Sequence, residues 1–273
     1  MHPSVRYLPF ALLFVAAVAG ARPPEPEPDN LLNDRFGLQA SIGYASSSTR
    51  VRFDADDGRL GTELDLEDDL AIPKNKIVGR GEVWFRMRER HRARLSSYYL
   101  PLDRRATTQL TRTINFGNDT FVANELVDSQ LEFRLLALSY SYSFLKNERF
   151  EAAASIGFDV VGFEAKATVP ARLRTVREDR SGPAPLGGLE GTARISSRWY
   201  AEGRFQYLSV KIDEVEGSLQ AWELNGLYRL NRNVTFGLGY STFRIEIDSL
   251  DPGDSGVFDL KTGGPQLFAR VGF

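Results

Sequence analysis

Apolar and polar residues alternate along most of this chain with a period of two. The clearest example is the C-terminal end, where one face carries Leu267, Ala269, Val271 and Phe273. The residues between them fall on the opposite face, as in a β-strand whose two faces meet different surroundings. Helical periodicity is hard to find elsewhere, so the sequence predicts an all-β protein.

The connections between the alternating segments are of two kinds, short and long, which alternate along the chain. Short turns fall at 89–91, 146–148, 196–198 and 231–233. Long polar loops fall near 54–76, 105–129, 169–187, 213–217 and 249–257. Ten strands lie between them, at about 35–52, 77–88, 92–104, 130–145, 149–168, 188–195, 199–212, 218–230, 234–248 and 258–273.

An even number of strands, with short turns at one end and long loops at the other, is typical of outer-membrane barrels. In lipid no water can satisfy an open sheet edge, so the strands must close into a ring. We therefore predict a closed antiparallel transmembrane β-barrel of about ten strands. Eight or twelve strands are the alternatives, if 105–129 holds a hairpin or the short strand at 188–195 fails.

Two strands change the phase of their alternation. Polar residues shift face near Leu135–Ala137, and a similar shift falls between Tyr240 and Arg244. One extra residue in a strand restores its register, so we expect a β-bulge at both places.

The first residues are expected to serve export and not the barrel. Arg6 precedes an almost wholly apolar run, and Ala19-Gly20-Ala21 fits a small-residue cleavage site, so 1–21 is predicted to be a secretory signal peptide. The alternative, a membrane anchor, needs a longer apolar run. The proline-rich 22–33 reads as a disordered leader. The barrel is expected over 34–273.

Composition excludes several classes of protein. The chain has 34 Lys and Arg against 36 Asp and Glu, for a net charge of −2; loss of Arg6 with the signal peptide makes it −3. This balance excludes a basic nucleic-acid-binding protein. There is no Cys and therefore no disulfide. No later segment has 18 continuous apolar residues, so no helical membrane span is expected.

Aromatic residues gather beside the short turns. They are Tyr140, Tyr142, Phe144, Phe150, Trp199, Tyr200, Tyr228 and Phe236. Amphipathic rings prefer the level of the lipid headgroups, so we interpret them as an aromatic girdle. The alternative is the core of a soluble β-protein.

The last strand resembles the C-terminal end of bacterial outer-membrane barrels, in which a terminal phenylalanine follows alternating apolar residues. Three internal pieces, GTELDLEDDL (61–70), ERHRARLSSYYL (89–100) and INFGNDTFVANELVDSQ (114–130), resemble uncharacterised proteobacterial small barrels of the OmpA- and OmpW-like class. The resemblance implies the outer membrane of a Gram-negative bacterium, with its lipids and lipopolysaccharide as surroundings. It also implies that Leu267, Ala269, Val271 and Phe273 form a sorting signal for the barrel-assembly machinery. It implies no catalytic residue.

Charged residues recur on one face of several predicted strands. They are Arg80, Glu82, Arg86, Arg88, Arg92, Arg94, Glu132, Arg134, Glu202 and Arg204. An arginine facing lipid at mid-membrane costs roughly 2–4 kcal/mol, so we expect all ten to face the lumen. They form either a salt-bridge plug or the lining of a narrow channel for small, anionic solutes.

Two loops are strongly charged. The first contains Asp65, Glu67, Asp68 and Asp69, whose carboxylates suit Ca²⁺ or Mg²⁺, although a solvated acidic loop explains them equally well. The loop near 169–187 contains the basic residues Arg172, Arg174, Arg177 and Arg180. These could contact the acidic loop, lipopolysaccharide phosphates or a partner protein, or they could simply be solvated.

Enzymatic chemistry has little support in the sequence. Beyond the signal peptide the chain has one histidine, His91, in a predicted short turn, and no cysteine or nucleotide-binding motif. The sequence therefore favours a non-enzymatic barrel with a structural or surface-interaction role. A narrow channel is the alternative, and a lipid- or peptide-modifying surface enzyme comes third.

Overall fold

The computed structural model of the chain describes residues 30–99, 104–170, 174–212, 215–249 and 255–273. The predicted signal peptide and most of the predicted leader lie outside these residues. None of the helices in the described ranges is long and apolar enough to span a bilayer.

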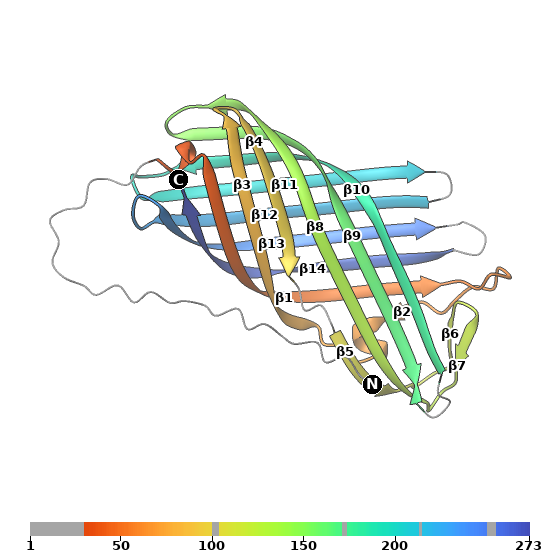
Figure 1. Cartoon of the computed structure of the whole chain (residues 1–273). Coiled ribbons are helices and arrows are strands. Elements are labelled where there is room, and N and C mark those ends of the chain that lie inside the picture. The colour runs from red at the N-terminus through yellow and green to blue at the C-terminus, as the bar shows by residue number, and fades with distance from the viewer. Residues whose placement is uncertain (1–29, 100–103, 171–173, 213–214, 250–254) are drawn as a thin grey trace, which may run out of the picture.

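Ten strands form a closed antiparallel ring (Figure 1). They are β1 (Phe36–Phe53), β3 (Asn75–Arg88), β4 (His91–Tyr99), β8 (Leu126–Lys146), β9 (Phe150–Val169), β10 (Arg174–Arg194), β11 (Trp199–Ile212), β12 (Val215–Arg229), β13 (Val234–Ser249) and β14 (Gly256–Gly272). Each pairs with the next, and β14 returns to β1 with Gly37 opposite Gly272 and Phe53 opposite Gly256. The closed barrel predicted from the alternation is therefore confirmed.

Smaller elements lie at the two ends of the barrel. At the long-loop end are β2 (Leu64–Asp65), α1 (Leu66–Asp69), β5 (Arg104–Gln109) and the hairpin of β6 (Ile114–Phe116) and β7 (Asp119–Phe121). At the short-turn end a 3-10 turn, η1 (Leu31–Asn33), lies within the segment expected to be a disordered leader. Its Leu31 and Leu32 are buried.

The sixth strand of the ring is much longer than expected. β10 begins at Arg174 and pairs with β9 along its length, so most of the predicted loop at 169–187 is strand. Pro183 and Pro185 obscured it, because proline cannot donate to a ladder. Both lie where β10 has a partner on one side only, since its pairing with β11 begins at Gly187. Arg174, Arg177 and Arg180 thus belong to a strand, and Arg172 is outside the described residues.

The two predicted bulges are wrong. β8 keeps a continuous register with β9 through Leu135–Ala137, and β13 does so with both neighbours between Tyr240 and Arg244. The side chains keep their alternation along both strands. The inner face changes instead from polar to apolar residues. Leu135 faces inward and is 4% exposed, in an apolar layer toward the long-loop end with Ile245 and Leu260. Register shifts occur instead at Arg86/Arg88 and Ser143/Leu145, beside short turns.

The outer face of the ring is apolar. Side chains that alternate with the inward ones are 45–68% exposed, among them Leu38, Ile42, Leu95, Leu138, Ile156, Leu224, Leu238 and Leu267. Such a surface is what a barrel presents to lipid. Of the expected girdle, Tyr140, Tyr142, Phe144, Phe150, Trp199 and Phe236 are exposed beside the short turns and Tyr228 is partly so. Tyr200 differs, because it points inward and packs with Leu31, Leu227 and Phe268.

Candidate functional site

Glu82 of β3 lies at the centre of a group of charged side chains that fills the lumen. Its carboxylate is 2% exposed and meets three guanidinium groups. The nitrogens of Arg80, Arg94 and Arg204 lie 2.7, 3.0 and 3.1 Å from its oxygens. Arg204 comes from β11, which is five strands from β3 in either direction around the ring. Side chains from opposite walls therefore meet in the middle of the barrel.

Two further glutamates extend this group. Glu223 of β12 accepts a hydrogen bond from Arg80 at 2.8 Å. Glu190 of β10 lies 2.7 Å from Arg94 and 3.0 Å from Arg92. A single connected set of ion pairs therefore links β3 and β4 on one wall to β10, β11 and β12 on the opposite wall.

Three bidentate pairs lie nearer the short-turn end. Arg86 donates to both oxygens of Glu151 at 2.9 Å, and Arg270 donates to both oxygens of Glu202 at 3.1 Å. Arg229 donates to both oxygens of Asp34, at 2.7 and 2.9 Å. Paired N–H groups facing a carboxylate make the strongest and most directional kind of protein ion pair.

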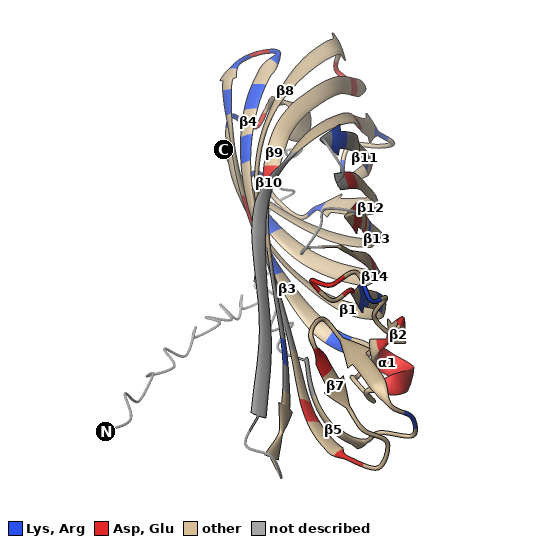
Figure 2. Ribbon diagram, turned by 90° about the vertical axis from the view of Figure 1, so that its right-hand side faces the viewer, with Lys and Arg blue, Asp and Glu red and all other residues tan. Residues whose placement is uncertain are grey.

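We call these residues the charge network: Arg80, Glu82, Arg86, Arg92, Arg94, Glu151, Glu190, Glu202, Arg204, Glu223, Arg229, Arg270 and Asp34. Its side chains are 1–13% exposed. It contains seven arginines and six carboxylates, and Asp159 adds a seventh buried carboxylate on the inner face of β9. Each arginine of the network has a carboxylate partner, as burial of its charge requires. Figure 2 shows the basic positions as blue bands on β3 and β4.

Neutral polar side chains complete the network. Gln266 and Asn225 donate to Glu223 at 2.7 and 2.8 Å, and Ser141 donates to Glu190 at 2.9 Å. The oxygen of Gln39 accepts from Arg270 at 2.8 Å. Because the carboxylates receive several donors each, their desolvation is offset locally and they hold fixed positions.

Little free space is left among these side chains. The cavity bordered by Glu82, Arg94, Glu202 and Arg270 measures only about 20 Å³. The η1 turn lies against it, where the backbone N–H of Leu31 donates to the Tyr200 hydroxyl at 3.3 Å. The short-turn half of the lumen is thus occupied by paired charges and covered by the apolar residues of η1.

Seven of the ten residues expected to face the lumen lie in the charge network: Arg80, Glu82, Arg86, Arg92, Arg94, Glu202 and Arg204. Arg88 does not; it follows the register shift at the end of β3 and is exposed. Glu132 and Arg134 lie in β8 at positions whose side chains are not described.

Six network members were missed: Asp34, Glu151, Glu190, Glu223, Arg229 and Arg270. Glu190 and Arg270 fall on the polar face of predicted strands, so strand periodicity could have identified them. The ion-pair partner of each residue could not be identified in this way, because most of the ion pairs join strands that are not neighbours in the sheet.

The long-loop end carries a compact structure that we call the head, formed by residues 54–74 and 104–125. Its two segments are joined by hydrogen bonds. Asn118 accepts from the N–H of Asp56 at 3.0 Å and donates to its carboxylate at 2.7 Å. Thr62 and Asn115 exchange two bonds, at 2.8 and 2.9 Å. β8, β9 and β10, with 20–21 residues each, rise beside the head in Figure 1.

The acidic residues of the head do not converge on a shared point. Asp65 caps α1 by accepting from the N–H groups of Glu67 and Asp68. Glu67 is buried and accepts from the N–H of Thr49 at 2.7 Å. Asp69 pairs with Arg112. No group of three or more potential ligands among the described residues could hold a metal ion. A Ca²⁺ or Mg²⁺ ion at this loop stays a prediction.

The Asp68 carboxylate also pairs with Lys74 at 2.9 Å, on the surface of the head. This hydrogen bond raises the pKa of the Lys74 ammonium, so the group stays charged over the whole physiological range. Figure 2 shows α1 as a largely red, acidic turn at the margin of the head.

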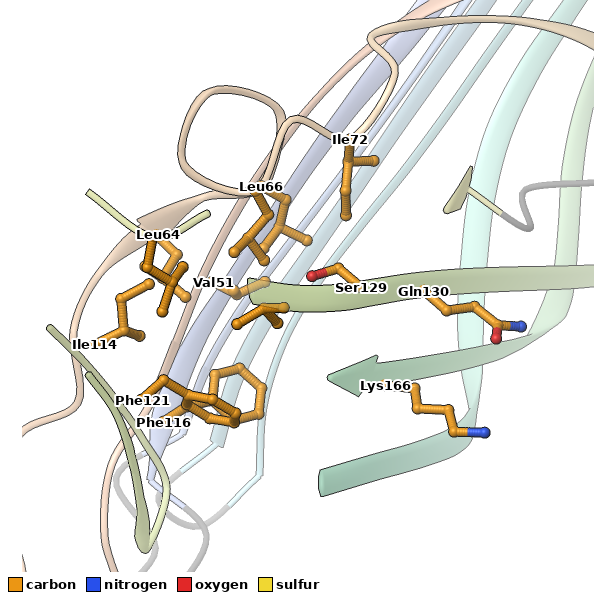
Figure 3. A pocket seen from close by; sticks show the side chains of 13 residues that line it. Val51, Leu64, Leu66, Ile72, Ile114, Phe116, Phe121, Ser129, Gln130 and Lys166 are labelled. Atoms are coloured by element: carbon orange, nitrogen blue, oxygen red, sulfur yellow. The ribbon is translucent and has the colours of Figure 1, made fainter. Parts of the chain in front are cut away.

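An apolar pocket lies beneath the head (Figure 3). Its walls come from the inner faces of β1 and β8, from the short α1 and β2 elements, and from the β6–β7 hairpin. The buried side chains of Leu64, Leu110, Phe121 and Val127 are 2–5% exposed. The pocket measures about 40 Å³, and Ser129 is the polar residue that points toward its apolar group.

His91 lies at the first residue of β4, at the short-turn end. Its Nδ1 is hydrogen bonded to the hydroxyl of Tyr140, and its ring lies 5.3 Å from that of Tyr142. The residue thus belongs to the aromatic girdle and lies at the opposite end of the barrel from the head.

Several solved structures align with this chain. The outer-membrane protease OmpT from Escherichia coli aligns with a TM-score of 0.61, 12% identity, 88% of this chain and 97% of its own. A Pseudomonas aeruginosa FadL homologue aligns with a TM-score of 0.38 at 9% identity, covering 87% and 90%. Ail from Yersinia pestis aligns with 0.36 at 15%, covering 88% and 99%. No protein-family model and no curated protein matches the chain.

The chain therefore has the fold of the outer-membrane β-barrels, as its last strand suggested. At 12% identity the likeness to OmpT concerns the fold and not the activity. The fold therefore leaves the activity of this chain open.

Proposed function

We propose that this protein is a non-conducting, non-enzymatic barrel of the Gram-negative outer membrane that acts through its head at the cell surface. The short turns face the periplasm in this arrangement, as an exported N-terminus requires. The apolar outer face contacts lipid, and the head lies among lipopolysaccharide. Leu267, Ala269, Val271 and Phe273 lie along the outer side of β14, accessible to the assembly machinery during insertion.

One observation carries the proposal: Arg204 and Glu82 are bonded across the full width of the lumen. In an open channel, opposite walls are separated by water. Here side chains from opposite walls meet at 3.1 Å, and the cavity beside them measures about 20 Å³. The interior of a ten-stranded barrel is small enough for side chains to fill it.

The alternative is a narrow channel for small anions. Such a channel needs guanidinium groups that face water and lack fixed counterions. The arginines of the charge network each face a carboxylate at 2.7–3.1 Å, so a passing anion would have to replace a buried ion pair. This arrangement favours the salt-bridge plug.

The absence of catalysis is proposed on the position of His91. Its ring is hydrogen bonded to Tyr140 at the end that faces the periplasm in this orientation, and the head lies at the other end. His91→Ala is expected to leave any lipid or peptide turnover by whole cells unchanged.

Anion flux tests the proposal directly. Purified protein in liposomes that contain a chloride-sensitive dye is expected to give the same quenching rate as empty liposomes. A porin in matched liposomes serves as the positive control. A chloride flux that scales with the amount of this protein would contradict the proposal. Membrane fractionation, with gel migration before and after boiling, tests the location and the closed barrel separately.

A further inference from the structure

We propose that the pocket beneath the head binds a small, mostly apolar molecule that carries one hydrogen-bonding group. The inference goes beyond the proposed function and does not depend on it, because a barrel that conducted ions would keep this pocket.

The walls of the pocket are almost wholly apolar. Val51, Leu64, Leu110 and Val127 are each 1–2% exposed and face it from β1, β2, the β5–β6 connection and β8. An apolar cavity releases water readily, so an apolar group gains free energy by entering it. The ends of Leu66, Ile72, Phe116 and Phe121 in Figure 3 are turned toward the same space.

Ser129 supplies the one polar contact that points into this space. The residue is 4% exposed, and its Oγ has no hydrogen-bond partner among the described residues. A buried hydroxyl without a partner carries a desolvation cost of about 1–3 kcal/mol. A ligand with a hydroxyl or carbonyl group would satisfy Ser129 Oγ while its apolar part occupied the rest of the pocket.

The pocket is preformed, and it adjoins a larger polar space. Bonds between the two head segments, such as those from Asn118 to Asp56, hold the loop-derived walls in place. A larger polar space of about 430 Å³ shares Ser129, Gln130 and Lys166 with the pocket. This space gives a small molecule a route from the surface.

Size and chemistry narrow the class of ligand. The apolar part of the pocket, about 40 Å³, holds a short alkyl group, and a ring attached to that group would lie in the adjoining space of about 430 Å³; a whole lipid is excluded. Lys166 also lines the pocket, but its amine is turned away from the apolar side chains in Figure 3, so a charged group among those side chains would lose its hydration without compensation. Phenols and short-chain alcohols or ketones fit both requirements.

Two probes that differ by one hydroxyl test the proposal: 4-ethylphenol and ethylbenzene. The protein is labelled at its leucine and valine methyl groups and titrated in detergent micelles by NMR. Leu64 and Val127 report on the pocket, and the outward-facing Leu238 and Leu267 report on partition of the probe into detergent. We expect saturable shifts at Leu64 and Val127 with 4-ethylphenol, and roughly two- to tenfold weaker binding of ethylbenzene.

Ser129→Ala provides the matched variant, because it removes the hydroxyl and keeps the apolar walls. It should abolish the difference between the two probes while both still bind. Equal binding of the probes to the unmodified protein would overturn the role of Ser129. Shifts at Leu64 and Val127 that do not saturate, and that follow those of Leu238 and Leu267, would overturn the site itself.

Discussion

Glu82 of β3 and Arg204 of β11 are five strands apart around the ring, yet their side chains are hydrogen bonded at 3.1 Å. The contact crosses the lumen and ties two opposite walls together. Since Arg80 and Arg94 approach the same carboxylate, one residue organises the centre of the barrel.

Replacement of Glu82 should therefore destabilise the barrel strongly. Glu82→Gln leaves Arg80, Arg94 and Arg204 buried around a neutral amide, and we expect a loss of about 3–5 kcal/mol in the free energy of unfolding. Urea unfolding in micelles, followed by tryptophan fluorescence, measures it. Glu216→Gln is the control, because it breaks an exposed pair with Lys211 whose loss costs roughly 0–1 kcal/mol. Equal effects of the two variants would contradict the central role of Glu82.

The packing of the η1 turn against the barrel should depend on Leu32. The side chain is 2% exposed within η1, and Leu32→Ala removes most of its buried surface. Because such a loss costs about 2–5 kcal/mol, amide exchange over residues 30–35 should accelerate at least tenfold. Hydrogen exchange followed by mass spectrometry measures it. Leu60→Ala, in an exposed part of the head, should leave that rate unchanged. An unaltered rate in Leu32→Ala would show that other contacts hold the turn.

Substitution of two phenylalanines near the end of the chain should affect the stability of the barrel in one case and its assembly in the other. Phe268 is 4% exposed and packs inside the barrel, whereas Phe273 is 65% exposed on the outside. Phe268→Ala should cost about 3–5 kcal/mol in unfolding experiments. Phe273→Ala should refold normally in detergent and reach the outer membrane of cells in reduced amounts. Normal surface levels of Phe273→Ala would remove the proposed sorting signal.

The head should loosen when its two segments are separated. Asn118→Ala removes two hydrogen bonds to Asp56, each worth roughly 0.5–1.5 kcal/mol. Amide exchange over residues 55–62 should therefore increase by about fivefold or more, and the barrel strands should keep their protection. Asn75→Ala, at the exposed start of β3, serves as the control. Increased exchange throughout the ring would indicate that the head and barrel unfold together.

The ring of strands could be predicted from the sequence because alternation and turn length are local signals. They located all ten strands but made β10 too short, because Pro183 and Pro185 interrupt the pattern where this strand has a partner on one side only. The expected bulges failed for a different reason. A bulge is needed only if the polar residues of a strand stay on its inner face, whereas Leu135 and Ile245 belong to an apolar inner layer.

The candidate sites were less predictable because they depend on contacts across the lumen. Periodicity placed Arg80 and Arg204 inside, but only closure of the ring brings them to Glu223 and Glu82. The pocket at Ser129 needs two loops to fold against the barrel wall, and no local pattern records that contact. Tyr200 is buried while its neighbour Trp199 is exposed in the girdle, because adjacent residues of a strand face opposite sides.

Single-channel recording in planar lipid bilayers tests the central claim, that contacts between opposite walls seal the lumen, most directly. The unmodified protein should give no conductance steps over the usual range of voltages. The Glu82→Ala/Arg204→Ala double variant removes the contact with no net change of charge and should give steps or a measurable leak. Regular, ion-selective steps from the unmodified protein would contradict the claim.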